Sequence, residues 1–230
     1  MEPMFEEKVF SYLSRKSHCK IVSRHLYLYG IGESKVEELL EDMMKNYENP
    51  SIAPYAQNGN LMIRITSKAQ TKDKAYELIE PVLNDIHQLL GDYVFSIDIP
   101  SIEETLVRAL NRNNLKIACA ESCTGGMIAQ RITDIPGSSS VFDMGIVSYA
   151  NHIKAQVLGV CQDTLEKYGA VSEEVAREMA KGALSLSGAD IAIATTGIAG
   201  PSGGSIEKPV GLVYIALAHK DGVYVGKYFF

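Results

Sequence analysis

The sequence has few cysteines and no long apolar run. Its four cysteines form no CxxC pair, so we expect neither a disulfide framework nor a cysteine-based metal site. Its five histidines are scattered and form no HExxH motif, and no metal or other cofactor is predicted. No apolar stretch approaches the roughly 20 residues of a membrane span, and the acidic start MEPMFEEKVF lacks the layout of a signal peptide. We therefore expect a cytoplasmic protein with reduced thiols and no membrane partner.

Positive charge is also scarce. Lys and Arg number 22 against 28 Asp and Glu, which gives a net charge of −6, and neither half of the chain holds a basic surplus. Nucleic-acid-binding proteins usually show such a surplus, so a nucleic-acid partner is not expected. The phosphate-binding motif GxxxxGK[ST] is absent too, and hydrolysis of nucleoside triphosphates is therefore not supported.

Short alternating elements fill the first 98 residues. Apolar and β-branched runs predict strands at 21–30, 61–66 and 93–99, and apolar residues at helical spacing predict helices at 33–47 and 71–92. The stretch with Pro50 and Pro54 interrupts this pattern and is expected to be a turn region. The pattern predicts a small α+β domain over residues 1–98, with little visible chemistry.

Pro100 marks the expected boundary to a second domain, residues 99–230. Strands are predicted at 115–122, 140–150 and 190–200, helices at 101–114, 125–135, 152–159 and 172–189, and a hairpin over 211–230. Strands that alternate with helices indicate a layered α/β domain with the hairpin at one edge. The chain ends within an apolar strand, Tyr228 to Phe230, so we expect this domain to be incomplete. Its aromatic end also leaves open a homodimer formed through that patch.

The stretch AESCTGG, residues 120–126, contains the first candidate reactive group. A strand that ends near Ala120 and a helix that starts near Thr124 place Ser122 at a strand-to-helix turn. The amides of Gly125 and Gly126 carry no side chain beside them and suit a developing oxyanion. Cys123 competes as the nucleophile, because a helix start lowers a thiol pKa. A serine or threonine that merely caps the helix is the commoner explanation of such a stretch.

A nucleophile needs a base, and SYANHIK, residues 148–154, offers two. His152 could pair with Ser122. Alternatively Lys154, assisted by Tyr149, could activate the serine, provided that burial lowers the lysine pKa from about 10.4 toward neutrality. Spacing alone also fits an ordinary exposed segment, so the residues by themselves leave these alternatives open.

The segment 195–211 is a long loop with five glycines and two prolines that follows a buried strand. Open α/β sheets bind ligands at the ends of such strands, and loops longer than about 12 residues are usually functional or disordered. Its backbone amides and the hydroxyls of Thr195, Thr196 and Ser202 are suited to a ribose or a phosphate.

These stretches together resemble one known family. AESCTGGMIAQRITDIPGSSSVFDMGIVSYANHIKAQVLGV, YGAVSEEVAREMAKGAL and TTGIAGPSGGSIEKPVGLVYIA are similar to the C-terminal domain of CinA, the family of the bacterial nicotinamide mononucleotide deamidases. Residues 1–98, including SRHLYLYGIGES, resemble more loosely its KH-like middle domain. The resemblance implies a KH-like α+β domain followed by a three-layer α/β/α domain.

The resemblance also implies an activity and its residues. The reaction would convert nicotinamide mononucleotide, a pyridine mononucleotide, to nicotinic acid mononucleotide and ammonia, without a cofactor. By motif, the catalytic serine, tyrosine and lysine fall on Ser122, Tyr149 and Lys154, which leaves His152 without a role. The implied substrate-binding residues are Thr124, Gly125, Gly126, Ser138, Thr196, Gly197, Gly200 and Lys208. The ADP-ribose pyrophosphatase domain of full-length CinA has no counterpart here, and its activity is not transferred.

A second hypothesis is a binding or scaffold protein without catalysis, in which the KH-like half contacts RNA or a partner protein. KH domains grip a nucleic-acid backbone with a GxxG loop. The nearest stretch here, Gly30-Ile31-Gly32-Glu33, lacks that motif and carries an acid instead of basic residues. This departure counts against RNA binding.

Overall fold

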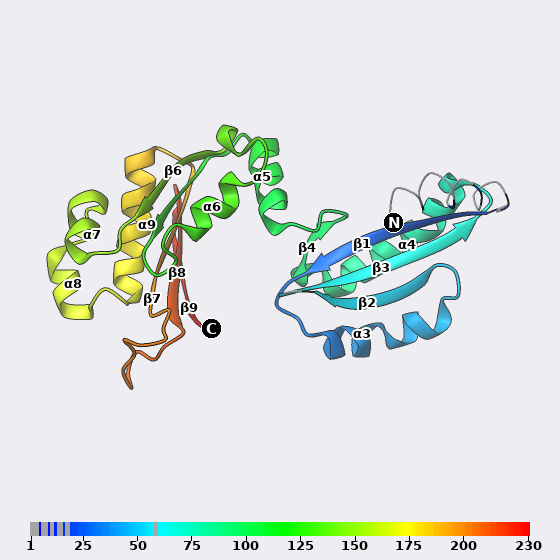
Figure 1. Cartoon of the computed structure of the whole chain (residues 1–230), viewed down its shortest axis with the longest axis horizontal. Coiled ribbons are helices and arrows are strands. Elements are labelled where there is room, and N and C mark those ends of the chain that lie inside the picture. The colour runs from blue at the N-terminus through cyan, green and yellow to red at the C-terminus, as the bar shows by residue number, and fades with distance from the viewer. Residues whose placement is uncertain (1–4, 6–8, 10–11, 13–15, 17–18, 58) are drawn as a thin grey trace. The chain divides into compact units, whose positions relative to one another are not determined.

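A computed structural model of the chain describes residues 19–57 and 59–230, together with residues 5, 9, 12 and 16. The chain divides into two compact units, Met1–Ile102 and Glu103–Phe230. Figure 1 shows the elements of both units with their labels. Within the described residues, no helix is both long enough and apolar enough to cross a membrane.

Over residues 19–57 and 59–102, the first unit forms a four-stranded antiparallel sheet with the helices α3 and α4. In chain order these are β1 (Lys20–Leu28), α3 (Glu33–Asn46), β2 (Ser51–Gln57), β3 (Asn60–Ala69), α4 (Lys72–Leu90), the 3-10 turn η2 (Gly91–Tyr93) and β4 (Val94–Ile97). The strands lie in the order β2-β3-β1-β4. This β-α-β-β-α-β succession with neighbours antiparallel is the ferredoxin-like arrangement.

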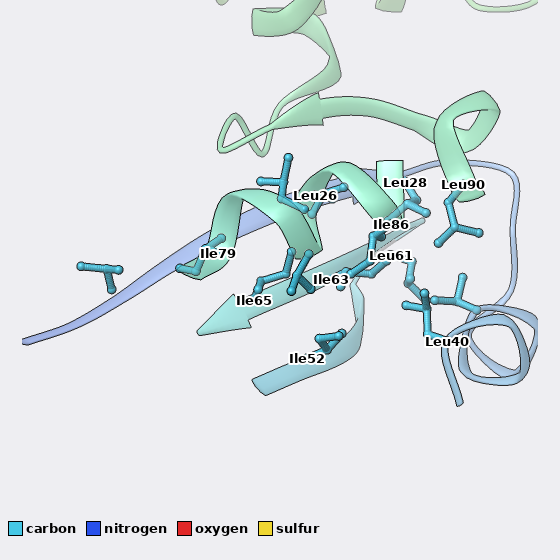
Figure 2. Close-up of a cluster of buried hydrophobic side chains, with 14 of the residues drawn as sticks. Leu26, Leu28, Leu40, Ile52, Leu61, Ile63, Ile65, Ile79, Ile86 and Leu90 are labelled. Carbon is cyan, nitrogen blue, oxygen red and sulfur yellow. The ribbon is translucent and has the colours of Figure 1, made fainter. Parts of the chain in front are cut away.

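The core of this unit lies between its sheet and the helices α3 and α4. Alternate residues of β1 and β3 point to one face, because side chains alternate along a strand. They meet apolar residues of α3 and α4, as Figure 2 shows. Thr71 caps α4, and its side chain accepts a hydrogen bond from the Lys74 amide. The labelled members of the cluster are Leu26, Leu28, Leu40, Ile52, Leu61, Ile63, Ile65, Ile79, Ile86 and Leu90.

The expected turn region around Pro50 and Pro54 contains a strand instead. Pro54 lies within β2 opposite Ile63 of β3. A proline removes one ladder donor and is therefore tolerated in a strand at the edge of a sheet. β2 is such an edge strand, so the prolines here do not exclude a strand.

The second unit is a five-stranded mixed sheet with helices on both faces. Its elements are α5 (Ile102–Asn113), β5 (Ile117–Glu121), α6 (Met127–Thr133), the 3-10 turn η3 (Ser138–Ser140), β6 (Phe142–Val147), α7 (Asn151–Leu158), α8 (Gln162–Tyr168), α9 (Glu173–Ser187), β7 (Ile191–Gly197), β8 (Leu212–His219) and β9 (Gly222–Phe229). The strand order is β6-β5-β7-β8-β9. β5 runs parallel to β6 and β7, β8 runs antiparallel to β7, and β9 pairs antiparallel with β8. The antiparallel hairpin lies at one edge of the sheet, as the sequence predicted.

The sheet is the middle of three layers, with helices packed against both of its faces. Toward α9 the strands β5, β7 and β8 present mainly alanines, namely Ala120, Ala192, Ala194, Ala216 and Ala218, all fully buried. Toward α5 and α6 the same strands present larger apolar residues such as Ile117 and Ile191. Figure 1 shows α9 and α6 on opposite sides of the sheet. The predicted α/β/α class is confirmed.

Helix α7 lies close to α9 because α9 has a glycine, Gly182, where the two helices meet. A Cβ atom added to Gly182 of α9 would lie 1.9 Å from the carbonyl oxygen of Leu158, the last residue of α7. No side chain fits in that space, so the glycine sets how near the two helices approach.

One element of this unit was not predicted, and one expectation about its C-terminal residues stays untested. The sequence patterns missed the short helix α8. The amide of its N-cap residue, Cys161, donates to the Glu178 carboxylate of α9. The aromatic side chains of Tyr228, Phe229 and Phe230 are exposed. Self-association through them stays a prediction.

Candidate active site

Ser122 lies just past the carboxyl end of β5, beside the central strand β7. It follows Glu121 directly, and its amide donates to the Thr195 carbonyl of the adjacent strand β7 at 3.0 Å. The parallel strands β5, β6 and β7 all end at this edge, where open α/β sheets place their ligands. Side chains from three distant segments of the sequence therefore meet at Ser122.

Lys154 approaches the serine from the first turn of α7. Its side chain is only 1% exposed, and its Nζ lies 3.1 Å from the Ser122 Oγ. The same nitrogen donates to the carbonyl oxygens of Ser148 at 2.7 Å and Tyr149 at 3.0 Å. Burial lowers the pKa of Lys154 below that of an ordinary lysine, and the nearby Cys123 sulfur offsets this only in part.

The three contacts of Lys154 suit a neutral amine. A carbonyl oxygen only accepts hydrogen bonds, so the two carbonyls engage two N–H groups of the amine. The hydroxyl of Ser122 both donates and accepts. When Lys154 is neutral, its lone pair is therefore directed toward the one partner that carries a transferable proton.

Cys123, the competing nucleophile, lies beside this pair. Burial raises the pKa of its thiol, although hydrogen bonds from backbone amides and from Thr195, and the charge of Lys154, act in the opposite direction. A thiol with a raised pKa is less often the reactive thiolate. Lys154 forms its hydrogen bond to the Ser122 hydroxyl, which favours the serine.

The amides of Gly125 and Gly126 are already engaged, which corrects their predicted role as oxyanion donors. Gly125 donates to the Ser122 carbonyl at 3.2 Å, and Gly126 donates to the Glu121 carboxylate at 3.0 Å. Both glycines have positive φ angles, 61° and 101°, which L side chains rarely adopt. They shape the turn rather than face a ligand.

A pocket of about 300 Å³ opens over Ser122. Among the predicted residues it brings together the three catalytic candidates with Thr196, Gly197 and Gly200. The Thr196 hydroxyl donates to the Ala170 carbonyl at 2.7 Å, so it also ties the pocket wall together. The lining residues are Ser122, Cys123, Tyr149, Lys154, Ala170, Val171, Thr196, Gly197, Ile198, Ala199, Gly200, Ser202 and Gly203.

Other predicted residues lie elsewhere or act differently. Lys208 donates from its Nζ to the Tyr168 carbonyl at 2.6 Å, at the end of α8. Ser138 is buried in η3 and does not line the pocket. Thr124 shares a hydrogen bond of 2.8 Å with Thr195 beneath the turn. Tyr149 contacts Lys154 through its main chain, while its side chain is 76% exposed at the pocket rim.

Sequence reasoning missed Glu121, Ser148 and the Ala170-Val171 wall. Glu121 is 1% exposed although it is an acid. An acidic residue at the end of a strongly apolar strand was the available signal, because such residues are almost never buried without partners. No group of three or more His, Cys, Asp or Glu side chains in the described part of the chain is arranged to hold a metal ion.

Comparison with known proteins places this geometry in a family. The model of the CinA C-terminal domain matches residues 99–230, and that of the damage-inducible protein CinA KH domain matches residues 23–96. A competence-damage inducible protein of Clostridium beijerinckii is 52% identical over 98% of this chain, and one of Thermoanaerobacter pseudethanolicus is 47% identical over the same share. The chain spans about half the length of these relatives, 53% and 54%.

Solved structures are similar to the second unit. The competence/damage inducible protein CihA from Agrobacterium tumefaciens shares 47% identity over 57% of this chain and 82% of its own, with a TM-score of 0.53. A CinA superfamily protein from Escherichia coli shares 38% identity over 56% of this chain and 74% of its own, with a TM-score of 0.54. By its domains, its relatives and its fold, the chain belongs to the CinA family of competence-damage inducible proteins.

Proposed function

We propose that the second unit is an amidohydrolase that converts nicotinamide mononucleotide to nicotinic acid mononucleotide and ammonia. The observation that carries this proposal is the buried Lys154 Nζ at 3.1 Å from the Ser122 Oγ. A serine acts as a nucleophile only when an adjacent base takes its proton. A lysine whose pKa is lowered by burial is such a base.

The reaction proceeds in two halves. The Ser122 Oγ attacks the carboxamide carbon of the substrate while its proton passes to the Lys154 Nζ. The tetrahedral intermediate collapses as the carbon–nitrogen bond breaks and Lys154 returns the proton to the leaving nitrogen, which departs as ammonia. Water then attacks the acyl-serine while Lys154 takes the proton of the water. The ester bond to Ser122 breaks as Lys154 returns this proton to the Ser122 Oγ, which releases the acid and restores the neutral lysine.

The developing oxyanion needs donors other than Gly125 and Gly126. We assign one of them to the amide of Cys123, because the residue after the nucleophile supplies this donor in other strand–serine–helix turns. Ser122 and Cys123 both line the pocket, which places the Cys123 amide beside the serine. One such donor contributes about 3 kcal/mol to catalysis in comparable sites.

The remaining pocket wall is formed by the loop after β7. It contributes Ile198, Ala199, Gly200, Ser202 and Gly203. Lys154 is the one Lys or Arg among the lining residues. The phosphate of the substrate is therefore assigned to backbone amides and the Ser202 hydroxyl of this loop rather than to an ion pair.

Ammonia release from nicotinamide mononucleotide tests the proposal. We expect Ser122→Ala to lose turnover by at least 1000-fold, as removal of a nucleophile does in related hydrolases. Cys123→Ala should keep most of it, and Ser187→Ala, at the far end of α9, is the serine control. An inactive Cys123→Ala together with an active Ser122→Ala would assign the chemistry to the thiol. If the wild-type chain releases no ammonia from nicotinamide mononucleotide, this compound is not its substrate.

A further inference from the structure

Glu121 is a buried carboxylate directly before the candidate nucleophile. It is 1% exposed, and no ion pair with a cation is recorded for it among the described residues. Its partners are backbone amides at the start of α6. Oε2 accepts from Gly126 at 3.0 Å and Ile128 at 3.1 Å, and Oε1 accepts from Ala129 at 2.8 Å.

These bonds close a short loop around Ser122. The main chain leaves the sheet at Glu121, passes through residues 122–125, and returns to the Glu121 side chain at Gly126. The main chain of Glu121 is also engaged, because its carbonyl accepts from the Ser148 amide at 2.8 Å. The Ser148 carbonyl in turn accepts from the Lys154 Nζ. One residue is thus linked to the turn that carries the serine and to the segment that holds the lysine.

The Glu121 carboxyl group is held in its charged form by the hydrogen bonds that it accepts. Burial by itself raises the pKa of this carboxyl, but hydrogen bonds from the Thr124 hydroxyl and from the amides of Ala129, Ile128 and Gly126 hold it below its usual value. The carboxylate is therefore charged at neutral pH and accepts hydrogen bonds at both oxygens. The Cys119 thiol adds a contact of 3.6 Å to Oε1.

We propose that Glu121 is a positioning residue: its carboxylate holds the 122–126 turn against the sheet so that the Ser122 Oγ stays within hydrogen-bond distance of the Lys154 Nζ. This inference rests on the proposed amidohydrolase chemistry of the pair. Glu121 touches neither atom of the pair directly. It acts through backbone geometry, and small displacements of reacting groups are costly in rate.

Glu121→Gln is the first test. The amide keeps the shape of the side chain, but its NH2 group must face at least one backbone N–H and lose that bond. We expect kcat to fall on the order of 100-fold, the typical effect of a displacement of about 1 Å. KM should change less than about threefold, because apart from Ser122 and Cys123 the pocket wall lies on other segments. The rate at which a fluorophosphonate labels Ser122 should fall by a similar factor.

Glu178→Gln is the matched control. Glu178 also accepts a backbone amide at a helix start, that of Cys161 at 2.7 Å, and the Thr164 hydroxyl at 2.8 Å, but it does not line the pocket. We expect this variant to lose some thermal stability and to keep kcat and the labelling rate. A folded Glu121→Gln whose kcat and labelling rate stay within threefold of wild type would overturn the proposal.

Glu121→Asp covers the case in which the amide variant does not fold. It keeps the charge but is one methylene shorter, so it should fold with kcat reduced at least tenfold, and wild-type kcat would overturn the proposal. If neither variant folds, Glu121 serves folding rather than alignment, which also overturns it. A wild-type chain that is labelled at Ser122 but releases no ammonia would refute the substrate alone. The labelling rates would then still decide the role of Glu121.

Discussion

The Lys154 Nζ lies 3.1 Å from the Ser122 Oγ, although 32 positions separate the two residues in the sequence. Strand β5 ends directly before Ser122, and helix α7 begins three residues before Lys154. The parallel pairing of β5 with β6, the strand that precedes α7, brings the two residues together. The contact depends on the fold of the whole second unit, and its consequences can be measured one residue at a time.

The pH dependence of turnover should report Lys154. Only the neutral amine accepts the serine proton, so activity should be low in acid and rise as the pH passes through the pKa of Lys154. Burial lowers that pKa, so the rise should occur below the value of about 10.4 of an ordinary lysine. The measurement is kcat/KM for nicotinamide mononucleotide from pH 6 to 10. A midpoint near 10.4, or no dependence on pH, would contradict Lys154 as the base.

Tyr149→Phe should be mild. The resemblance assigned the phenol a catalytic role, whereas Lys154 contacts the main-chain carbonyl of Tyr149 and the side chain is largely exposed. Phenylalanine keeps that carbonyl, so we expect kcat to fall less than about tenfold, the cost of one ordinary hydrogen bond. The measurement is kcat of Tyr149→Phe from steady-state kinetics, compared with kcat of Ser122→Ala under the same conditions. A loss as large as that of Ser122→Ala would restore the phenol to the proton path.

The cysteines of the second unit should react with a thiol reagent in a fixed order. Cys161 is exposed, Cys123 is half-buried with a raised pKa, and Cys119 is fully buried. Burial and the neighbouring Glu121 raise the pKa of Cys119 to about 12, so its thiolate is absent at pH 8. Mass spectrometry of iodoacetamide-treated protein should show Cys161 alkylated first and Cys119 last. Early alkylation of Cys119 in folded protein would conflict with the structure.

Nicotinamide riboside, which lacks the phosphate, should be a poor substrate. Hydrogen-bond donors of the 198–203 loop would be left without their acceptor, at about 1–3 kcal/mol for each buried group. We expect kcat/KM to fall at least tenfold relative to the mononucleotide. Ser202→Ala should reduce the difference in kcat/KM between the mononucleotide and the riboside, since Ser202 lines the pocket. Equal efficiencies on both compounds would mean that the loop does not bind a phosphate.

Much of the fold could be predicted from the sequence, because apolar periodicity reports burial. The helix over 33–47 and the helix beginning after Ser172 both appear close to their predicted bounds. The strand with Pro54 was missed because tolerance for proline depends on being at a sheet edge, which no local pattern reveals. The helix α8 was missed because it is seven residues long, too short to show a clear period.

The site was predictable only in its residue types. A serine before two glycines and a lysine downstream indicated the pair, but not the burial that gives Lys154 its lowered pKa. The glycine amides were assigned to the ligand because the sequence cannot show that a preceding carboxylate occupies one of them. Glu121 acts through hydrogen bonds from backbone amides. Because every residue except proline has such an amide, the sequence carries no pattern that marks the partners of Glu121.

The alanines of the sheet bear on how this protein tolerates change. Along β7, Ala192 and Ala194 face α9, while Ile191 and Ile193 face α5 and α6. A cavity left by a shortened isoleucine costs stability in proportion to its size, whereas any side chain larger than alanine must push α9 away. Mutational tolerance along this strand therefore alternates with a period of two. One set of positions is sensitive to lost volume and the other to added volume, within a single run of seven residues.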